Sequence, residues 1–447
     1  MTSRGKGRRS FDPFRIANLG GPGGTGPAAA IPAGLREGMA AFRHRDFRVF
    51  FWGALASNSG NWLQNLAVPY VLFELTGRSL WVGLAGFAQF LPSFLLGPLG
   101  GALADRCDRR RVLLASQGAM AAAALLLWGV WVVGWRDPWL VLAITALTGV
   151  FSGIMIPSWQ AFVPALVPRV DLPSAITLNS TQFNASRAVG PALAGLLLAV
   201  AGPGWAFLIN AVSFLAVIAA LVAIRPATEA APEARGSLGV IAGFREALAY
   251  MARRRGILVS VLCAVLVASL GNPVTQFTVV FAADVYESGP TVLGLLAASI
   301  GLGAIAAAPL LSMWSTRAPR AQVVRWGLPI YGMAVLGFGL ARHWALGLVA
   351  LLLSGAGFLA VISTTNTSVQ MIVAEEMRGR VMSARVMAFT LSFPLGSLLQ
   401  GLIADEVGPQ WTVSGAGVML LLAAAFLLRR PDLLDALDAE DDTPDRH

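Results

Sequence analysis

Long apolar blocks that are almost free of charge alternate with short polar stretches between residues 49 and 428. Each block has roughly 20 to 25 residues, enough for a helix to cross the ~30 Å hydrocarbon core of a bilayer. Barrel strands are only about 10 residues long and alternate strictly, so the pattern predicts an all-α membrane protein. The twelve predicted spans are 49–73, 80–104, 111–134, 138–163, 176–201, 204–224, 257–282, 290–314, 321–341, 344–371, 380–404 and 409–428.

Composition supports a membrane protein and leaves little room for other chemistry. The chain is 56% hydrophobic and 13% charged, whereas a soluble domain carries roughly 25% charged residues. Its three histidines lie outside the spans, and Cys107 and Cys263 are the only cysteines. We therefore expect no metal, no cofactor and no intramembrane enzyme.

The arginines report membrane orientation. The connections on one side of the predicted spans are rich in arginine, whereas those on the other side hold only Arg78, Arg136 and Arg342. The positive-inside rule then predicts that both termini are cytoplasmic. Topology explains the net charge of +9, so we expect no nucleic-acid partner.

Composition also divides the chain into five parts. We expect a disordered basic cytoplasmic tail at 1–48, a six-helix bundle at 49–224 and a second bundle at 257–428. A cytoplasmic linker at 225–256 contains the amphipathic stretch "GFREALAYMARRR", and an acidic cytoplasmic tail occupies 429–447.

The two predicted bundles repeat each other. Matches at an offset of 211 residues include Gly60-Asn61 with Gly271-Asn272, Gly83-Leu84 with Gly294-Leu295, and Pro98 with Pro309. Matches at an offset of 206 residues include Gly190 with Gly396, Gly195 with Gly401, and Trp205 with Trp411. A tandem duplication of a six-helix unit describes the major facilitator architecture, in which two bundles enclose a central path.

A polar face interrupts the first span. Asn58, Asn61, Gln64 and Asn65 gather on one side of a helix, and an amide buried without a partner costs roughly 2–7 kcal/mol. At the 211 offset their counterparts are Ser269, Asn272, Thr275 and Gln276. Because the face recurs, it predicts side chains that point into the protein rather than toward lipid.

The fourth and tenth spans carry further amides: Gln160 matches Asn366 at the 206 offset, and Gln370 follows one turn later. Two interpretations remain open for all of these side chains. They either line a substrate cavity or join helices by hydrogen bonds, and the two roles are compatible.

The loop after the second span reads Gly101-x-Leu103-Ala104-Asp105-Arg106-x-x-Arg109-Arg110. It resembles the loop signature of the major facilitator superfamily, which implies a conformational latch centred on Asp105 that stabilises an outward-open state. Asp108 stands where the family usually has glycine. The small residues predict a close approach of the second helix to a neighbour.

The fifth span contains Gly190-Pro191-x-x-Ala194-Gly195. This stretch resembles the antiporter motif of major facilitator exporters, and its glycines favour close helix packing. Residues 42–428 are similar to the enterobactin-exporter-like group, also called transmembrane secretion effectors, with macrolide efflux proteins as relatives. The resemblance implies export of a bulky amphiphile, such as a siderophore or drug, through a bacterial cytoplasmic (inner) membrane by proton antiport.

Few charges are available for coupling or recognition. We predict Arg187 to be the only charge well inside a span, where it either contacts an anionic substrate or extends to the cytoplasmic surface. Glu74 and Asp284, near the outer ends of spans, are the candidates for proton coupling.

Other classes fit less well. A phosphate-binding loop needs a lysine, and the only lysine, Lys6, lacks that context, which excludes an ATP-driven pump. The duplication disfavours a channel. An importer or a lipid or lysolipid transporter of the same fold remains the alternative, and we expect the protein to act as a monomer.

Overall fold

The computed structural model describes residues 38–224, 240–315 and 318–439, and all regular structure in these ranges is helical. Most of the predicted first tail, the first part of the predicted linker and residues 440–447 lie outside the described residues.

Six long helices form the N-terminal bundle, with short 3-10 turns at Ala40–Arg43, Val163–Leu166 and Arg169–Asp171. The long helices are α2 (Arg45–Thr76), α3 (Ser79–Arg106), α4 (Arg109–Val132), α5 (Pro138–Phe162), α6 (Leu172–Val200) and α7 (Pro203–Ala223). Each begins and ends within a few residues of a predicted span.

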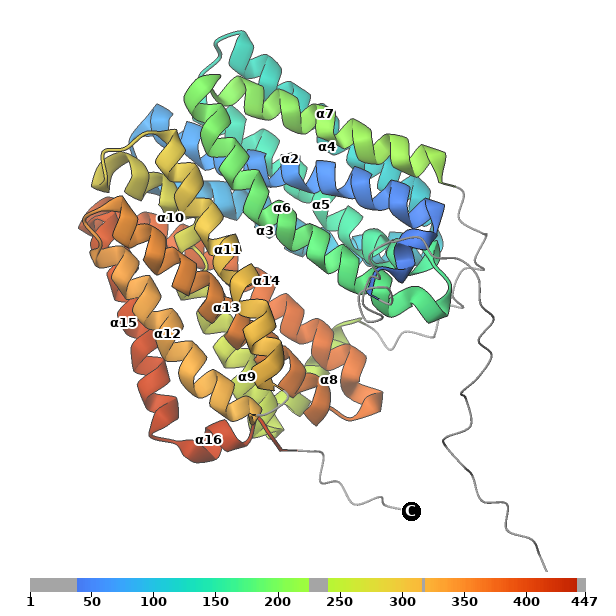
Figure 1. Ribbon diagram of the computed structural model, residues 1–447, viewed down its shortest axis with the longest axis vertical. Coiled ribbons are helices and arrows are strands. Elements are labelled where there is room, and N and C mark those ends of the chain that lie inside the picture. Colours follow the sequence, from blue (N-terminus) through green and yellow to red (C-terminus); the bar gives the residue numbers. More distant parts are fainter. Residues whose placement is uncertain (1–37, 225–239, 316–317, 440–447) are drawn as a thin grey trace, which may run out of the picture.

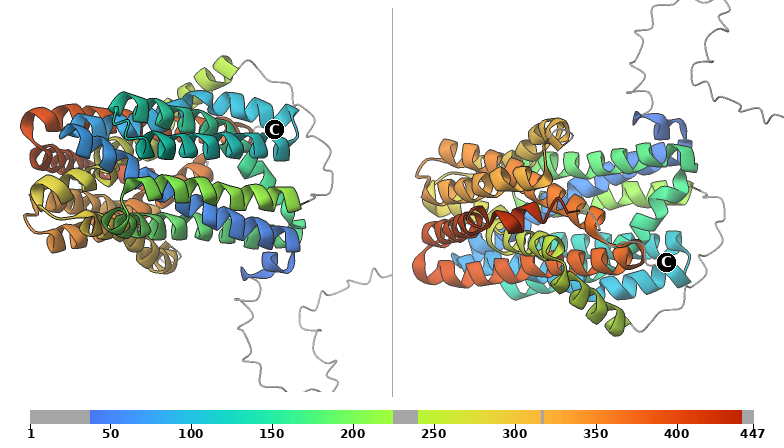
Figure 2. Two further views of the ribbon diagram at one scale, coloured as in Figure 1. Left: turned by 90° about the horizontal axis from the view of Figure 1, so that it is seen from above. Right: turned by 90° about the horizontal axis from the view of Figure 1, so that it is seen from below.

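The C-terminal bundle follows α8 (Val240–Arg253), which lies at the periphery of the long helices (Figure 2). Its first span is interrupted and consists of α9 (Arg255–Leu266), a π-helical turn at Val267–Gly271, α10 (Val274–Val280) and a second π-helical turn at Phe281–Val285. The remaining helices are α11 (Pro290–Ser315), α12 (Arg320–Leu340), α13 (Trp344–Ile372), α14 (Glu375–Val407), α15 (Pro409–Leu428) and α16 (Pro431–Asp435).

Among the described residues, eleven helical segments are long and apolar enough to cross a membrane, which confirms the all-α membrane fold. The first predicted span, α2, is not among them although it has 32 residues. Its amide-rich face lowers its hydropathy, yet α2 packs between α6 and α7 within the bundle. The packing of α2 against α6 and α7, rather than its hydropathy, shows that this helix belongs to the bundle.

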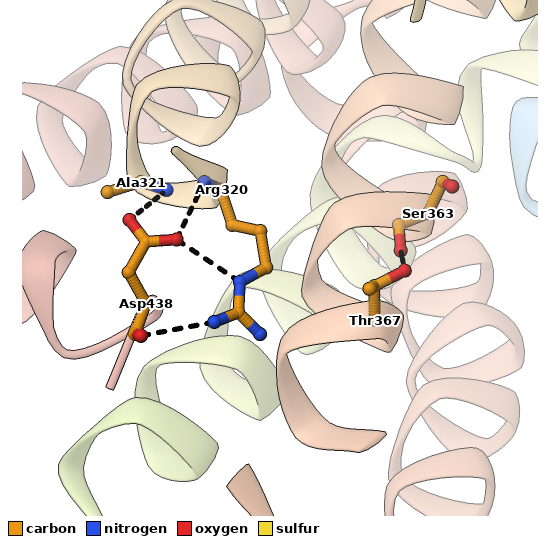
Figure 3. Close-up of polar contacts among 5 residues, drawn as sticks. All are labelled: Arg320, Ala321, Ser363, Thr367 and Asp438. Atoms are coloured by element: carbon orange, nitrogen blue, oxygen red, sulfur yellow. Dashed lines mark hydrogen bonds and ion pairs between the residues drawn. The ribbon is translucent and has the colours of Figure 1, made fainter. Parts of the chain in front are cut away.

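Both predicted tails are ordered where they adjoin the bundles. In the first, Phe47 is buried and the Ala41 N–H donates to Ser174 Oγ at 3.1 Å. In the second, the Asp438 carboxylate accepts bonds from the backbone N–H groups of Arg320 and Ala321 (Figure 3). Asp438 therefore caps the first turn of α12, where a negative charge is favourable.

Pro273 accounts for the break between α9 and α10. Proline lacks an N–H, so the carbonyl four residues earlier, on Ser269, has no helical donor. Gln400 of α14 donates to Ser269 O at 2.9 Å and to Leu270 O at 2.8 Å. The side chain of a neighbouring helix thus satisfies the carbonyls that the break exposes.

We call the ends of the bundles the arginine-rich end, where α8 and α16 lie, and the arginine-poor end, which holds Arg78, Arg136 and Arg342. The bundles spread apart toward the arginine-rich end (Figure 1). They meet through α3 and α14 and through α6 and α11, in the halves of these helices nearest the arginine-poor end. A Cβ added to Gly195 of α6 would lie 2.4 Å from Gly294 Cα of α11, and one on Gly83 of α3 would lie 2.5 Å from Ser397 O of α14. Glycine at these positions permits the close contact.

One carboxylate completes the closure of the arginine-poor end. Asp405 of α14 accepts a bond from Arg78 Nε at 2.9 Å and one from the Leu80 backbone N–H at 3.0 Å. The side chain of Asp405 is 11% exposed. A residue of one bundle therefore pairs with an arginine of the other and also caps its helix α3.

We expect Asp405→Asn to loosen this closure, because the change removes the charge that both contacts use. The buried Ser79, replaced by cysteine in a Cys107→Ser background, should then react several-fold faster with a polar maleimide in the purified protein. Glu406→Gln is the matched control, since Glu406 is exposed and adjacent. Equal labelling rates in the two variants would contradict this role of Asp405.

Candidate functional site

Arg187 lies where the two bundles meet. Its guanidinium carbon is 5.6 Å from the ring centroid of Trp62 on α2 and 5.2 Å from that of Phe358 on α13. These distances suit cation–π attraction. Arg187 therefore faces the opposite bundle rather than the cytoplasmic surface, and its contact with an anionic substrate stays a prediction.

The pocket beside Arg187 is formed mainly by the C-terminal bundle. Its lining includes Gly271, Asn272, Thr275, Tyr331 and Phe358. A Cβ added to Gly271 would lie 2.3 Å from the Tyr331 ring, so glycine is needed for this ring to pack. Asn272 lies next to the break at Pro273 and lines the same pocket.

Three of the four amides on α2 bond to other helices of their own bundle. Asn58 donates to Gln182 Oε1 at 3.2 Å, and Gln64 Oε1 accepts from the buried Asn210 at 2.7 Å. Gln89 donates to Asn65 Oδ1. Asn61 makes no hydrogen bond with any described residue. The interpretation of amides as links between helices therefore accounts for three of them and leaves Asn61 available.

The other amide side chains predicted to line the cavity, from the second repeat and the fourth span, lie in surroundings that differ from one to the next. Gln276 is buried near Gly86 of α3, whereas Gln160 and Gln370 are exposed toward the arginine-rich end. Asn366 accepts a bond from Arg385 at 2.9 Å. The matching offsets thus do not give matching environments.

Arg385 of α14 corrects the prediction that Arg187 is the only charge well inside a span. Arg385 is 5% exposed and donates to Asn366 Oδ1, to Thr365 Oγ1 at 3.1 Å and to the Ile362 carbonyl at 3.3 Å. Arg385 lies within the predicted span 380–404, but the sequence does not show its partners on α13. The arginine joins α13 to α14.

The loop motif lies at the arginine-rich end of α3. Asp105 and Arg106 are exposed, and Asp105 has no hydrogen bond or ion pair with any described residue. Arg110 donates to the Leu221 carbonyl at 2.6 Å and to the Val222 carbonyl at 2.8 Å, at the end of α7. Arg109 is partly buried at the start of α4.

Two details of the motif differ from expectation. Gly101 faces open space, while its neighbour Gly100 makes the close approach, since a Cβ there would lie 2.6 Å from Gly153 O of α5. Asp108, which stands in place of a glycine, accepts a bond from the Arg111 N–H at 3.1 Å and caps α4. Its φ of −59° needs no glycine.

The second motif packs α6 on both sides. A Cβ on Gly190 would lie 2.5 Å from Trp62 Cβ on α2, and Gly195 faces Gly294 as described above. Pro191 is buried, and its carbonyl lies close to Gly294. The motif therefore sets the position of α6 between α2 and the opposite bundle.

The two candidates for proton coupling are remote from the pocket. Glu74 and Asp284 are exposed near the arginine-poor end, and neither forms a hydrogen bond with a described residue. No group of three or more His, Cys, Asp or Glu side chains within the described ranges could hold a metal ion.

Comparison with known proteins identifies the family. The family model for transmembrane secretion effectors matches residues 36–447. Macrolide efflux protein A of Streptococcus pyogenes is 23% identical, with 80% of this chain and 89% of that protein aligned. The staphyloferrin A transporter of Staphylococcus aureus is 24% identical, with 83% and 92% aligned. The enterobactin exporter EntS of Escherichia coli is 28% identical, with 86% and 91% aligned.

Solved structures show the same fold. A bacterial homologue of the human lysosomal transporter Spinster, in an inward-facing and unoccupied conformation, aligns with a TM-score of 0.70 at 15% identity, covering 89% of this chain and 99% of that one. A D-xylose–proton symporter aligns with a TM-score of 0.67 at 14% identity, covering 85% and 96%. The predicted resemblance and the predicted major facilitator fold are both confirmed.

The two kinds of amide on α2 should respond differently to substitution. Gln64→Leu leaves the buried Asn210 amide without its acceptor, so we expect a loss of about 1–3 kcal/mol of stability and a lower melting temperature in detergent. Asn61→Leu should leave the melting temperature nearly unchanged, because Asn61 makes no hydrogen bond with a described residue that the substitution would break. Equal melting temperatures for the two variants would contradict the assignment.

Proposed function

The chain belongs to the transmembrane secretion effector family of the major facilitator superfamily, whose members are transporters rather than enzymes, and from this premise we propose that it exports a bulky amphiphilic small molecule. A drug or a siderophore-like compound fits this description. Alternating access of the two bundles around the Arg187 pocket is the mechanism. Within this proposal the protein acts as a monomer in a bacterial inner membrane.

The observation that carries the proposal is the asymmetry of the contacts between the bundles. They meet at the arginine-poor end, around Gly195 and Asp405, and spread apart at the other. The positive-inside rule assigns the arginine-rich end to the cytoplasm. This arrangement supports entry of the transported molecule from the cytoplasmic side, because the bundles are in contact at the outer end.

The direction of transport is supported by two further points. Two of the relatives bear the names of an efflux protein and an exporter, and the Gly190-Pro191 stretch resembles the antiporter motif. An importer or a lipid or lysolipid transporter is the alternative. Proton antiport belongs to the proposal, with Glu74 and Asp284 as the coupling candidates.

A vesicle assay tests export and coupling together. Everted membrane vesicles with an acidified interior should accumulate a fluorescent amphiphilic dye when they contain the protein, because outward transport in the cell is inward transport in such vesicles. A protonophore should release the dye. Accumulation that is equal with and without the protein would refute export, and accumulation that ignores the protonophore would refute proton coupling.

The latch proposal concerns Asp105. Its carboxylate lies free at the proposed cytoplasmic end, as expected for a latch that engages only when that end closes. We expect Asp105→Asn to slow dye transport several-fold without reducing the amount of protein in the membrane. Asp435→Asn is the control, because Asp435 is exposed on α16. Transport at the unsubstituted rate in Asp105→Asn vesicles would remove the latch role.

A further inference from the structure

Arg187 is a charge without a counter-charge. It makes no hydrogen bond or ion pair with any described residue; its charge lies near the rings of Trp62 and Phe358 and interacts electrostatically with the neutral Tyr331. A guanidinium carries five N–H donors and no acceptor. Aromatic faces attract its charge but leave these donors without oxygen partners, although a cation in an apolar setting normally has them.

Arg385, which also lies well inside a span, shows how the protein satisfies a buried guanidinium. Arg385 donates to Asn366, Thr365 and a backbone carbonyl, all on α13. The protein itself thus supplies oxygen acceptors to Arg385 and none to Arg187. This difference indicates that Arg385 links two helices, whereas Arg187 is available to bind a ligand.

None of the carboxylates toward the arginine-poor end provides the missing counter-charge. Glu74 and Asp284 are exposed near the arginine-poor end, and Asp405 already pairs with Arg78. Within the described ranges, the pocket lining contains no carboxylate and one cation, Arg187. The charge of the pocket is therefore positive.

The surroundings of Arg187 define a shape as well as a charge. Asn272, whose side chain makes no hydrogen bond with a described residue, lines the same pocket from the opposite bundle. An anionic group bound to the guanidinium can also accept from an amide such as this one. The partly exposed Phe358 offers ring surface to an apolar body beside the anion, and the buried Tyr331 packs behind the pocket wall.

We propose that Arg187 and Asn272 bind an anionic group of the transported molecule, so that the substrate class is an organic anion with an aromatic or apolar body. This inference rests on the proposed function and names its substrate class. A cation would be repelled by the guanidinium. A neutral analogue would displace water from it without providing a counter-charge. The positive pocket thus selects for negative charge.

Two probes that differ only at one carboxyl group, ionised in one and methylated in the other, test the proposal. Dansyl-leucine carries a free carboxylate, whereas its methyl ester is neutral with the same naphthalene body. The binding of each to the purified protein in lipid nanodiscs is measured by fluorescence polarisation. We expect the acid to bind about tenfold tighter or more, the range of a charge-assisted hydrogen bond. Equal or tighter binding of the ester, or binding of neither probe, overturns the proposal.

Variants assign the preference to one residue. Arg187→Gln should bring the ratio of the two dissociation constants close to one by weakening the acid alone, and Arg187→Lys should keep part of it, since the charge remains without the planar fork. Arg385→Gln is the matched control and should keep the full ratio, even if its melting temperature falls. A full ratio in Arg187→Gln, or its loss in Arg385→Gln, overturns the assignment.

The outcome is separable from that of the vesicle assay. Probe binding needs no gradient and no direction of transport. If the acid is preferred and the preference depends on Arg187, the binding proposal holds even when everted vesicles fail to accumulate a dye. If vesicles accumulate the ester as well as the acid and the binding ratio is one, export holds and the substrate class is wrong.

Discussion

The shortage of hydrogen-bond partners inside a bilayer governs this structure. No water in the hydrocarbon core can satisfy a polar group, so each one must find a partner within the protein or face a wet cavity. Gln64 meets Asn210, Arg385 meets Asn366, and Gln400 meets the carbonyls that Pro273 leaves open. Some buried hydroxyls, such as Ser57 Oγ and Ser158 Oγ, have no partner among the described residues, so an unpaired group marks a ligand site only where it also lines a pocket. Within the described ranges, Arg187 and Asn272 meet both conditions.

Close contact between the bundles depends on the absence of side chains. Gly83, Gly195 and Gly294 bring backbones together where any Cβ would collide. Such contacts leave out water but bring little attraction that lipid could not also offer. The Arg78–Asp405 pair adds an electrostatic contact at the rim of this interface. Within the described residues the interface therefore combines close backbone packing with the polar contacts of Asp405, an arrangement that agrees with the proposed separation of the bundles.

The sequence predicted what depends on period and length, and it did not predict what depends on partners. The spans and the repeated Gly60-Asn61 pair followed from runs of residues and fixed offsets. Helical periodicity places Gln64 on a polar face but does not reveal Asn210 beyond it. For the same reason the sequence does not predict the burial of Arg385, or that Gly100 rather than Gly101 makes the close contact with α5. The family resemblance leads one to expect a glycine at position 108. Asp108 instead caps α4 with its side chain, and its backbone conformation does not require glycine.

Asp405 has two roles at the arginine-poor end, one between the bundles and one at the start of α3. The carboxylate that fastens the bundles also holds the first turn of α3 through the Leu80 N–H. Separating the bundles at that end removes an anionic cap from a helix start, so the two events share one free-energy cost. In the proposed transport cycle, opening this rim leaves the first turn of α3 without its anionic cap, and closing it restores the cap. Under that proposal the same carboxylate favours the state of the empty protein that faces the arginine-rich end.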